Sequence, residues 1–377
     1  MEGIMVRIRN VEQVFIYKDP KLAHAANQGS IVTLQNGEVL MGFNEERYPR
    51  HADTGQSCFI KSKDGGKTWD PATKKVVWPY TDFWGYFDCA FAQISDGTIL
   101  MHTRICSFSS FIAPQGIKSE SLKRQTGYVL FKSKDNGNKW TGPIPVNTSP
   151  VANCGDPNYS GGCAVGGSGA GHIVELSDGG LIFALCGRLG LEMWEEASFL
   201  LRSDDGGDNW EYWATMAYDP AGIICWIEPG MTRLKDGKLI CLYRTSYRRP
   251  GRQDNMWFNY SEDDGITWSP PKRTGLWGYP ADVLQLQDGR VLAVYGYRKA
   301  PWGVRGCVSE DGMTWDIKNE FVIREGGAAP PEFGSGYYHI GYPTVTQLKD
   351  GTIIAAFHEY SDDKPPIQYL RCTRFKL

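Results

Sequence analysis

One eight-residue phrase, Ser-x-Asp-x-Gly-x-x-Trp, recurs along this chain and is called the Trp phrase below. Four complete copies begin at Ser62, Ser133, Ser203 and Ser261, and a fifth, from Ser309 to Trp315, is one residue shorter. A phrase that returns in this way marks a fold built from equivalent units. Because the phrase is present in most units, it is expected to belong to the scaffold, and chemistry is expected where the units differ.

A second phrase, a hydrophobic residue followed two positions later by Asn-Gly or Asp-Gly, runs in step with the first. Its six glycines are Gly37, Gly97, Gly179, Gly237, Gly289 and Gly351. Such pairs between apolar runs predict β-hairpins with type I′ turns, in which both central residues take positive φ. Each unit then comprises four antiparallel strands, which describes a propeller blade. The predicted fold is all-β: a six-bladed β-propeller of four-stranded antiparallel blades.

The two ends of the chain are expected to meet. Only 26 residues follow Gly351, and they contain no further Trp phrase. The strand-like run 12–17 is predicted to supply the missing outer strand by pairing with the C-terminal strand, because closure removes an exposed sheet edge. The repeats run almost end to end, so residues 1–377 are expected to form one domain.

Composition excludes several classes of partner. The net charge is −3 with no basic stripe, so nucleic acid is not an expected ligand. The sequence has no apolar run long enough for a signal peptide or a membrane span, which favours a cytoplasmic protein. The ten cysteines are scattered and are expected to be reduced, although a Cys154–Cys163 disulfide is allowed. The sequence has no metal-ligand pattern, and no cofactor is expected.

The repeat provides a register for reading the end of the propeller opposite the turns. Nine residues before the turn glycines stand Gln28, Asp88, Ala170, Glu228, Pro280 and Tyr342, and seven residues after them stand Asn44, Arg104, Cys186, Arg244, Gly296 and His358. Strand alternation places both rows at one mouth of the ring, where a polar binding site is predicted.

The residue types at this mouth favour a sugar as the ligand. Aromatic faces stack on sugar rings, and charged side chains that make paired hydrogen bonds bind hydroxyl or carboxylate groups. The predicted substrate-binding residues are Arg244, Arg104, Arg298, Asp88, Gln28, Arg47, His172, Tyr279 and His358.

These features together resemble the sialidase (neuraminidase) superfamily, in which the Trp phrase is called the Asp-box and the propeller has six blades. The resemblance covers nearly the whole chain. Ile227-Glu228, followed by Tyr243-Arg244, resembles the blade that carries the catalytic glutamate and a substrate-binding arginine. Gly341-Tyr342-Pro343 resembles the blade with the catalytic tyrosine, and His51-Ala52-Asp53 resembles the loop with the acid/base aspartate.

The resemblance implies an exo-acting glycoside hydrolase that removes a terminal acidic sugar such as sialic acid. Sialidases use a tyrosine nucleophile in place of a second carboxylate. A phenol has a pKa near 10, so it needs a base at neutral pH. Tyr342 would be the nucleophile, Glu228 its base, and Asp53 the acid/base that serves the leaving oxygen and then water.

The chain departs from the family at the arginines that hold the substrate carboxylate. Sialidases have three, but the segment Ala26–Ser30 has none where the first is expected, and only Arg244 aligns cleanly. A cluster of Arg104, Arg244 and Arg298 is one way to bind an acidic sugar. The alternatives are a propeller enzyme, hydrolase or lyase, acting on arabinan, uronate or rhamnose linkages, and a catalytically inert carbohydrate-binding propeller.

Overall fold

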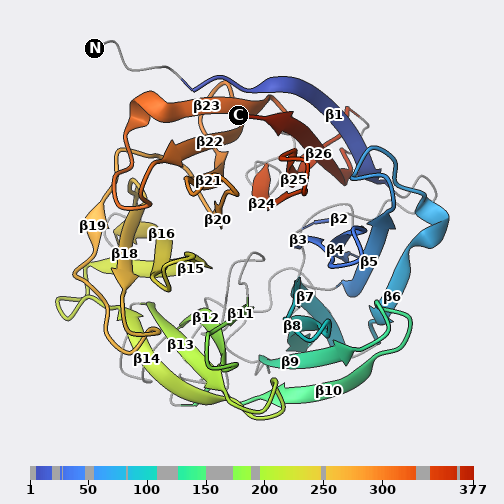
Figure 1. Cartoon of the computed structure of the whole chain (residues 1–377), viewed down its shortest axis with the longest axis horizontal. Helices are drawn as coiled ribbons and strands as arrows, with labels where there is room; N and C mark the ends of the chain where they lie inside the picture. Colours follow the sequence, from blue (N-terminus) through green and yellow to red (C-terminus); the bar gives the residue numbers. More distant parts are fainter. Residues whose placement is uncertain are drawn as a thin grey trace, which may run out of the picture.

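The repeated hairpins fold into six antiparallel sheets arranged around a common centre (Figure 1). The structure is a computed structural model that describes residues 6–18, 26–27, 29–46, 55–81, 84–107, 126–149, 173–187, 196–247, 252–327, 340–362 and 366–377. The predicted six-bladed propeller is confirmed.

In the first three blades the strands pair in chain order, except that the two short first strands of blade 1 both pair with its third strand. Blade 1 contains β2 (Ala26–Asn27), β3 (Ile31–Thr33), β4 (Val39–Glu45), β5 (Gln56–Ser62) and β6 (Lys75–Trp78). Blade 2 contains β7 (Trp84–Gln93), β8 (Ile99–Ser107), β9 (Thr126–Ser133) and β10 (Thr141–Val146). Blade 3 contains β11 (Ile173–Glu175), β12 (Leu181–Gly187), β13 (Ala197–Ser203) and β14 (Glu211–Ala217).

The last three blades repeat this order, with one addition. Blade 4 contains β15 (Ile224–Arg233), β16 (Leu239–Tyr247), β18 (Trp257–Ser261) and β19 (Lys272–Arg273), and the short β17 (Arg252–Gln253) pairs with β16. Blade 5 contains β20 (Ala281–Gln285), β21 (Val291–Tyr297), β22 (Gly303–Ser309) and β23 (Glu320–Glu325). Blade 6 contains β24 (Gly341–Gln347), β25 (Ile353–Tyr360), β26 (Gln368–Lys376) and β1 (Arg9–Tyr17).

The ring closes through β1, which lies along the outside of β26 (Figure 1). The register pairs Val14 with Cys372 and Gln13 with Thr373. The expected pairing of the N- and C-terminal strands is therefore confirmed.

The hairpin turns differ from the expected type I′. The six turn glycines take positive φ, but none of the Asn or Asp residues before them does. In blade 1 the Gly37 N–H donates to the Leu34 carbonyl at 2.8 Å, and the Leu34 N–H donates to the Glu38 carbonyl at 2.8 Å. This pattern is a type I turn followed by a glycine bulge, a three-residue loop that needs only one positive φ. The hairpins were predicted correctly, but the turn type was wrong.

The Trp phrase is a turn that also packs blades together. In the first copy the Ser62 Oγ donates to Asp64 at 2.7 Å and accepts the Gly66 N–H at 2.8 Å. The tryptophan that follows packs against the preceding blade, as Trp69 of blade 1 does with Ile354 of blade 6 and Trp210 of blade 3 with Leu100 of blade 2. The scaffold role expected of the repeat follows from this packing.

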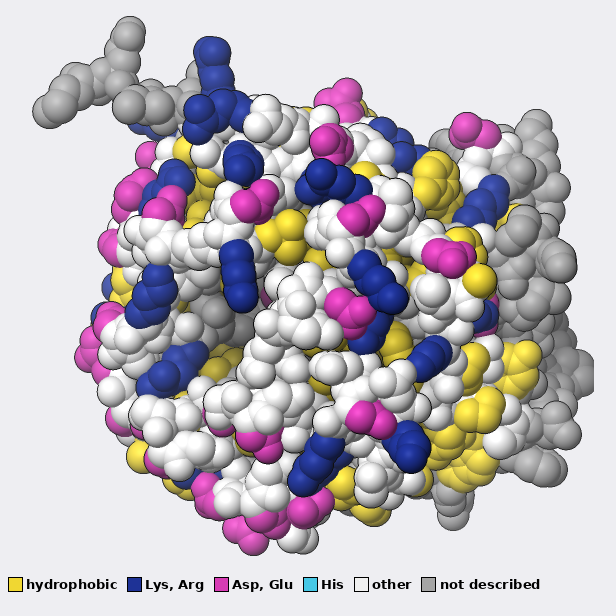
Figure 2. Space-filling model, turned by 45° about the vertical axis from the view of Figure 1, so that its right-hand side comes forward, with side chains coloured by type: hydrophobic (Ala, Val, Ile, Leu, Met, Phe, Trp, Pro, Cys, Tyr) yellow, Lys and Arg dark blue, Asp and Glu magenta, His cyan; other side chains and the backbone are white. Residues whose placement is uncertain are grey.

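Charges of both signs are mixed over the outside of the ring. On the face in Figure 2, Lys and Arg side chains lie among Asp and Glu side chains, and neither sign forms a continuous patch there. No helix in the described ranges has the length and apolar character required to cross a membrane. Seven cysteines of the described part are free thiols, namely Cys58, Cys89, Cys186, Cys225, Cys241, Cys307 and Cys372. Cys154 and Cys163 lie outside the described residues.

Candidate active site

Three inner strands carry a β-bulge at the same register position. The pairing shifts between Phe87 and Ala90 in β7, between Ile227 and Gly230 in β15, and between Gly341 and Thr344 in β24. The first bulged residues are Asp88, Glu228 and Tyr342, in alternate blades 2, 4 and 6. A bulge re-aims the side chain that it carries and is common beside active sites.

Glu228 and Tyr342 meet although they lie 114 residues apart. The Tyr342 hydroxyl donates to Glu228 Oε1 at 2.8 Å. Both residues have positive φ, 49° and 45° respectively, a backbone state that costs a non-glycine residue about 1–2 kcal/mol. Strained residues of this kind concentrate at functional sites.

Arg244 joins this pair from the neighbouring strand β16. Its Nη1 donates to the same Glu228 Oε1 at 2.9 Å, and its Nε donates to Gln253 Oε1 at 3.0 Å. Arg244 is 20% exposed and Glu228 is 13% exposed. The second carboxylate oxygen, Glu228 Oε2, is buried and accepts no hydrogen bond from the described residues. One carboxylate oxygen of Glu228 thus accepts two hydrogen bonds, and the other accepts none from the described residues.

Burial and charge set the protonation of the tyrosine. Burial raises the pKa of Tyr342, the negative Glu228 raises it further, and Arg298 and Arg244 lower it in part. Burial lowers the pKa of Arg244, but its interactions with Glu228, Tyr342 and Tyr279 together outweigh burial, so the pKa is raised. At neutral pH Tyr342 is therefore a neutral phenol, and its hydroxyl is hydrogen-bonded to the same Glu228 oxygen that Arg244 contacts.

Blade 5 adds two more of the predicted residues. The guanidinium carbon of Arg298 lies 5.0 Å from the centre of the Tyr342 ring and 4.6 Å from that of the Tyr279 ring. The guanidinium carbon of Arg244 lies 4.2 Å from the centre of the same Tyr279 ring. The structure thus brings together Tyr342, Glu228, Arg244, Arg298 and Tyr279.

The other described candidates take different places. His358 is buried and stacks on Tyr342 at 5.8 Å, so it supports the tyrosine from within the blade. Arg104 is half-buried on β8. For Asp88 only the backbone is described. Asp53, Gln28, Arg47 and His172 lie outside the described residues.

Two residues that position the site were not predicted. Gln253, on the added strand β17, accepts from Arg244, and the Cys186 sulfur accepts the Glu228 backbone N–H at 3.4 Å. Strand β17 lies outside the repeat, so no register pointed to Gln253. Cys186 is one of the residues that stand seven positions after the turn glycines, but only the structure shows that it contacts the next blade.

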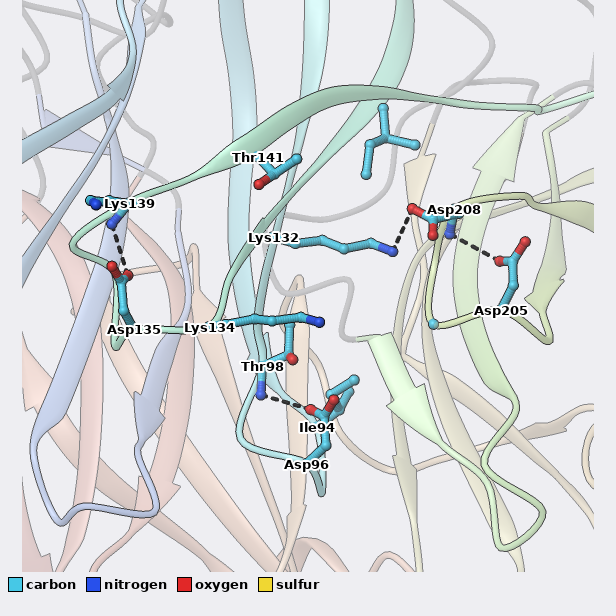
Figure 3. A pocket seen from close by; sticks show the side chains of 12 residues that line it. Ile94, Asp96, Thr98, Lys132, Lys134, Asp135, Lys139, Thr141, Asp205 and Asp208 are labelled. Atoms are coloured by element: carbon cyan, nitrogen blue, oxygen red, sulfur yellow. Dashed lines mark hydrogen bonds and ion pairs between the residues drawn. The ribbon is translucent and has the colours of Figure 1, made fainter.

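A cavity of about 610 Å³ lies at the turn end, between blades 2 and 3 (Figure 3). Its lining includes Asp96 from a hairpin turn and Asp205 from a Trp phrase, which confirms that both kinds of turn share one end. Lys132 reaches Asp208 at 2.6 Å, and Asp96 accepts its own turn's Thr98 N–H at 2.8 Å. These carboxylates are engaged in turns and ion pairs, so the cavity is separate from the candidate active site.

No group of three or more His, Cys, Asp or Glu side chains in the described ranges has the arrangement of a metal site. The described candidate site offers a phenol, a carboxylate and guanidinium groups.

Comparison with known proteins places the chain in a family. Residues 108–355 match the BNR repeat-like domain. No curated protein matches the sequence. A crystal structure of a Dyadobacter fermentans protein of unknown function is similar, with 24% identity and a TM-score of 0.79, covering 98% of this chain and 99% of that chain.

Sialidases and an arabinanase share the fold at lower identity. The NanB sialidase of Streptococcus pneumoniae is 14% identical with a TM-score of 0.64, covering 96% of this chain and 70% of that chain. The α-L-arabinanase of Penicillium chrysogenum is 13% identical with a TM-score of 0.62, covering 97% of this chain and 98% of that chain. The chain therefore belongs to the BNR repeat-like domain family, and its propeller fold is similar to that of these enzymes.

Proposed function

We propose that this protein is a glycoside hydrolase that removes a terminal acidic sugar, with Tyr342 as nucleophile and Glu228 as its base. The observation that carries the proposal is the 2.8 Å hydrogen bond from the Tyr342 hydroxyl to Glu228, made from bulges in two blades that are not adjacent.

Tyrosine–glutamate hydrogen bonds alone are not specific, because this molecule contains others. Tyr295 donates to Glu320 at 2.6 Å and Tyr17 donates to Glu45 at 2.7 Å. Those two tyrosines are buried, and their partners lie in the same or the adjacent blade. Tyr342 differs because it is half-buried and meets a glutamate from a blade two places away.

The proposed reaction needs the proton arrangement that the pair provides. The Tyr342 oxygen attacks the anomeric carbon and gives its proton to Glu228, while the glycosidic oxygen takes a proton and leaves. Water gives a proton to the acid/base and attacks the anomeric carbon, and the Tyr342 oxygen then leaves and takes its proton back from Glu228. The raised pKa of Tyr342 explains why a base must be in contact with it. Asp53 is proposed as the acid/base on the sequence resemblance alone.

Charge favours an anionic sugar. Arg244 and Arg298 both stack on Tyr279, which is itself half-buried beside the nucleophile. Guanidinium groups bind carboxylates through paired N–H donors, so they suit a sugar acid better than a neutral pentose.

The test is a panel of chromogenic glycosides: a sialoside, a glucuronide, a rhamnoside and an arabinoside. We expect turnover of an acidic glycoside, and losses of about 10²–10⁴-fold in kcat for Tyr342→Phe and Glu228→Gln. Tyr295→Phe is the matched control, since it removes a tyrosine–glutamate bond elsewhere and should leave kcat within a few-fold. Equal turnover by the wild type and both site variants would exclude the mechanism.

The panel also separates the alternatives. Turnover of the arabinoside or the rhamnoside alone would keep the enzyme but reject the acidic substrate. Sugar binding without turnover of any glycoside would favour the inert carbohydrate-binding propeller.

A further inference from the structure

Tyr279 was predicted to contact substrate, but two side chains of the protein already lie over its ring. The guanidinium groups of Arg244 and Arg298 lie over it, with their central carbons 4.2 and 4.6 Å from the ring centre. A cation over an aromatic face is attracted by the ring's quadrupole, most strongly where water is excluded. Both contacts are made to the face of the Tyr279 ring, so the ring itself supplies them.

The backbone fixes where this ring sits. The Tyr279 N–H donates to the Gly296 carbonyl at 2.9 Å, which ties the residue to the end of β21. Trp277 packs edge-on against the Tyr279 ring, with ring centres 5.9 Å apart. Tyr279 is therefore a fixed support, whereas the two arginines are long and flexible.

The arginines compete for one carboxylate. Arg244 is paired with Glu228 Oε1, while the buried Oε2 accepts no hydrogen bond from the described residues. Arg298 lies over the Tyr342 ring, whose hydroxyl contacts Glu228, so its guanidinium belongs to the same cluster of side chains as that carboxylate. In a partly buried site the attraction between Arg298 and the free oxygen is strong.

We propose that Tyr279 is a positioning residue that seats Arg298 as well as Arg244 and so keeps Arg298 from closing on Glu228 Oε2. This inference rests on the proposed function for its kinetic consequences. The free oxygen leaves Glu228 able to take the Tyr342 proton, and the ring of Tyr279 holds both guanidinium groups beside the site where an anionic sugar would bind.

The structural test compares Tyr279→Leu with Tyr279→Phe in crystals. Tyr279→Phe keeps the ring and should leave both arginines in place. Tyr279→Leu removes the ring, and the Arg298 guanidinium should then lie within about 4 Å of Glu228 Oε2. Arginines that keep their wild-type positions in Tyr279→Leu would overturn the proposal. Thermal unfolding checks that each variant folds, and Tyr279→Met replaces the leucine variant if that one does not.

The kinetic test uses the acidic glycoside that the panel identifies. We expect kcat/KM to fall about 10- to 100-fold in Tyr279→Leu and less than about 3-fold in Tyr279→Phe. Adding Arg298→Gln to Tyr279→Leu should restore kcat, since no cation is left to occupy Oε2, while KM stays raised. A double variant with kcat no higher than that of Tyr279→Leu would reject the proposed role.

The two tests separate this inference from the proposed function. A wild-type protein without glycosidase activity would refute the function, yet the crystal structures of the Tyr279 variants would still decide where Arg298 goes.

Discussion

At the scale of single residues, the tryptophans of the Trp phrases fall into two kinds. The indole N–H of Trp69 donates to the Gly66 carbonyl at 3.2 Å, whereas that of Trp315 is buried with no partner among the described residues. Both side chains are 7% exposed. They therefore form a matched pair in which similar apolar area is buried but only one hydrogen bond is made.

We expect Trp69→Phe to lower the free energy of unfolding by about 0.5–1.5 kcal/mol more than Trp315→Phe. The first variant breaks a satisfied hydrogen bond and strands the Gly66 carbonyl, while the second removes an N–H that was already unpaired. Urea unfolding followed by circular dichroism measures both. A larger loss for Trp315→Phe would contradict this account.

Individual site residues were predictable where the repeat supplied a register. Glu228 and Tyr342 share one offset from their turn glycines, so their common level in the ring followed from counting residues. The role of Tyr279 and the contact of Gln253 with Arg244 did not follow, because both residues lie in segments to which the register does not extend. Which face of an aromatic ring is occupied depends on side-chain packing, and spacing in the sequence does not encode it.

At the scale of strands, the bulge in β15 brings two blades into unusually close contact. A Cβ built on Gly230 would lie 2.2 Å from the Ala281 carbonyl oxygen of β20. That atom belongs to the backbone and has no freedom to move aside. Glycine at position 230 thus lets the strand that carries Glu228 lie against the blade that carries Tyr279.

We expect Gly230→Ala to lower the free energy of unfolding by about 1–3 kcal/mol, because the added methyl group forces β15 away from β20. Gly127→Ala is the matched control, since Gly127 also lies in a strand but has nothing within 4 Å of its built Cβ. Chemical denaturation of the two variants tests this. Equal stability of both would show that the contact relaxes without cost.

The strands were largely predictable, and their irregularities were not. Turn glycines and apolar runs fix where a hairpin reverses, so the inner hairpins and the closing pair β1–β26 followed from the sequence. The bulges at Glu228 and Tyr342 did not, because a bulge changes the pairing and leaves the length of the apolar run unaltered. The type I′ expectation failed because a glycine bulge satisfies the same Asp-Gly pair with one positive φ instead of two.

At the scale of the whole molecule, the Trp phrases place a ring of aspartates at the end away from the candidate active site. Their pKa values are all lowered, at Asp64, Asp135, Asp205, Asp263 and Asp311. At Asp64 burial favours the neutral acid, but hydrogen bonds from Thr68, Ser62 and nearby backbone N–H groups outweigh it and bring the pKa to about 2.

The sign of the pH dependence follows from these lowered values. A carboxyl with a pKa of 3.8 in the unfolded chain and about 2 in the folded protein binds fewer protons when folded. Its contribution to stability is complete well above pH 4 and is lost as the pH falls toward 2. Because five blades carry such a carboxylate, we expect the urea midpoint to vary little between pH 7 and 5 and to drop steeply between pH 4 and 2.

Asp64→Asn shows whether the aspartates cause this drop. The variant cannot titrate at that position, so it should be less stable than the wild type at pH 7 and lose less stability between pH 4 and 2. Asp362→Asn, at an exposed aspartate outside the Trp phrases, should follow the wild-type curve. If all three proteins lose stability in parallel below pH 4, acid sensitivity arises elsewhere, and the carboxylate of the Trp phrase acts only through the shape of its turn.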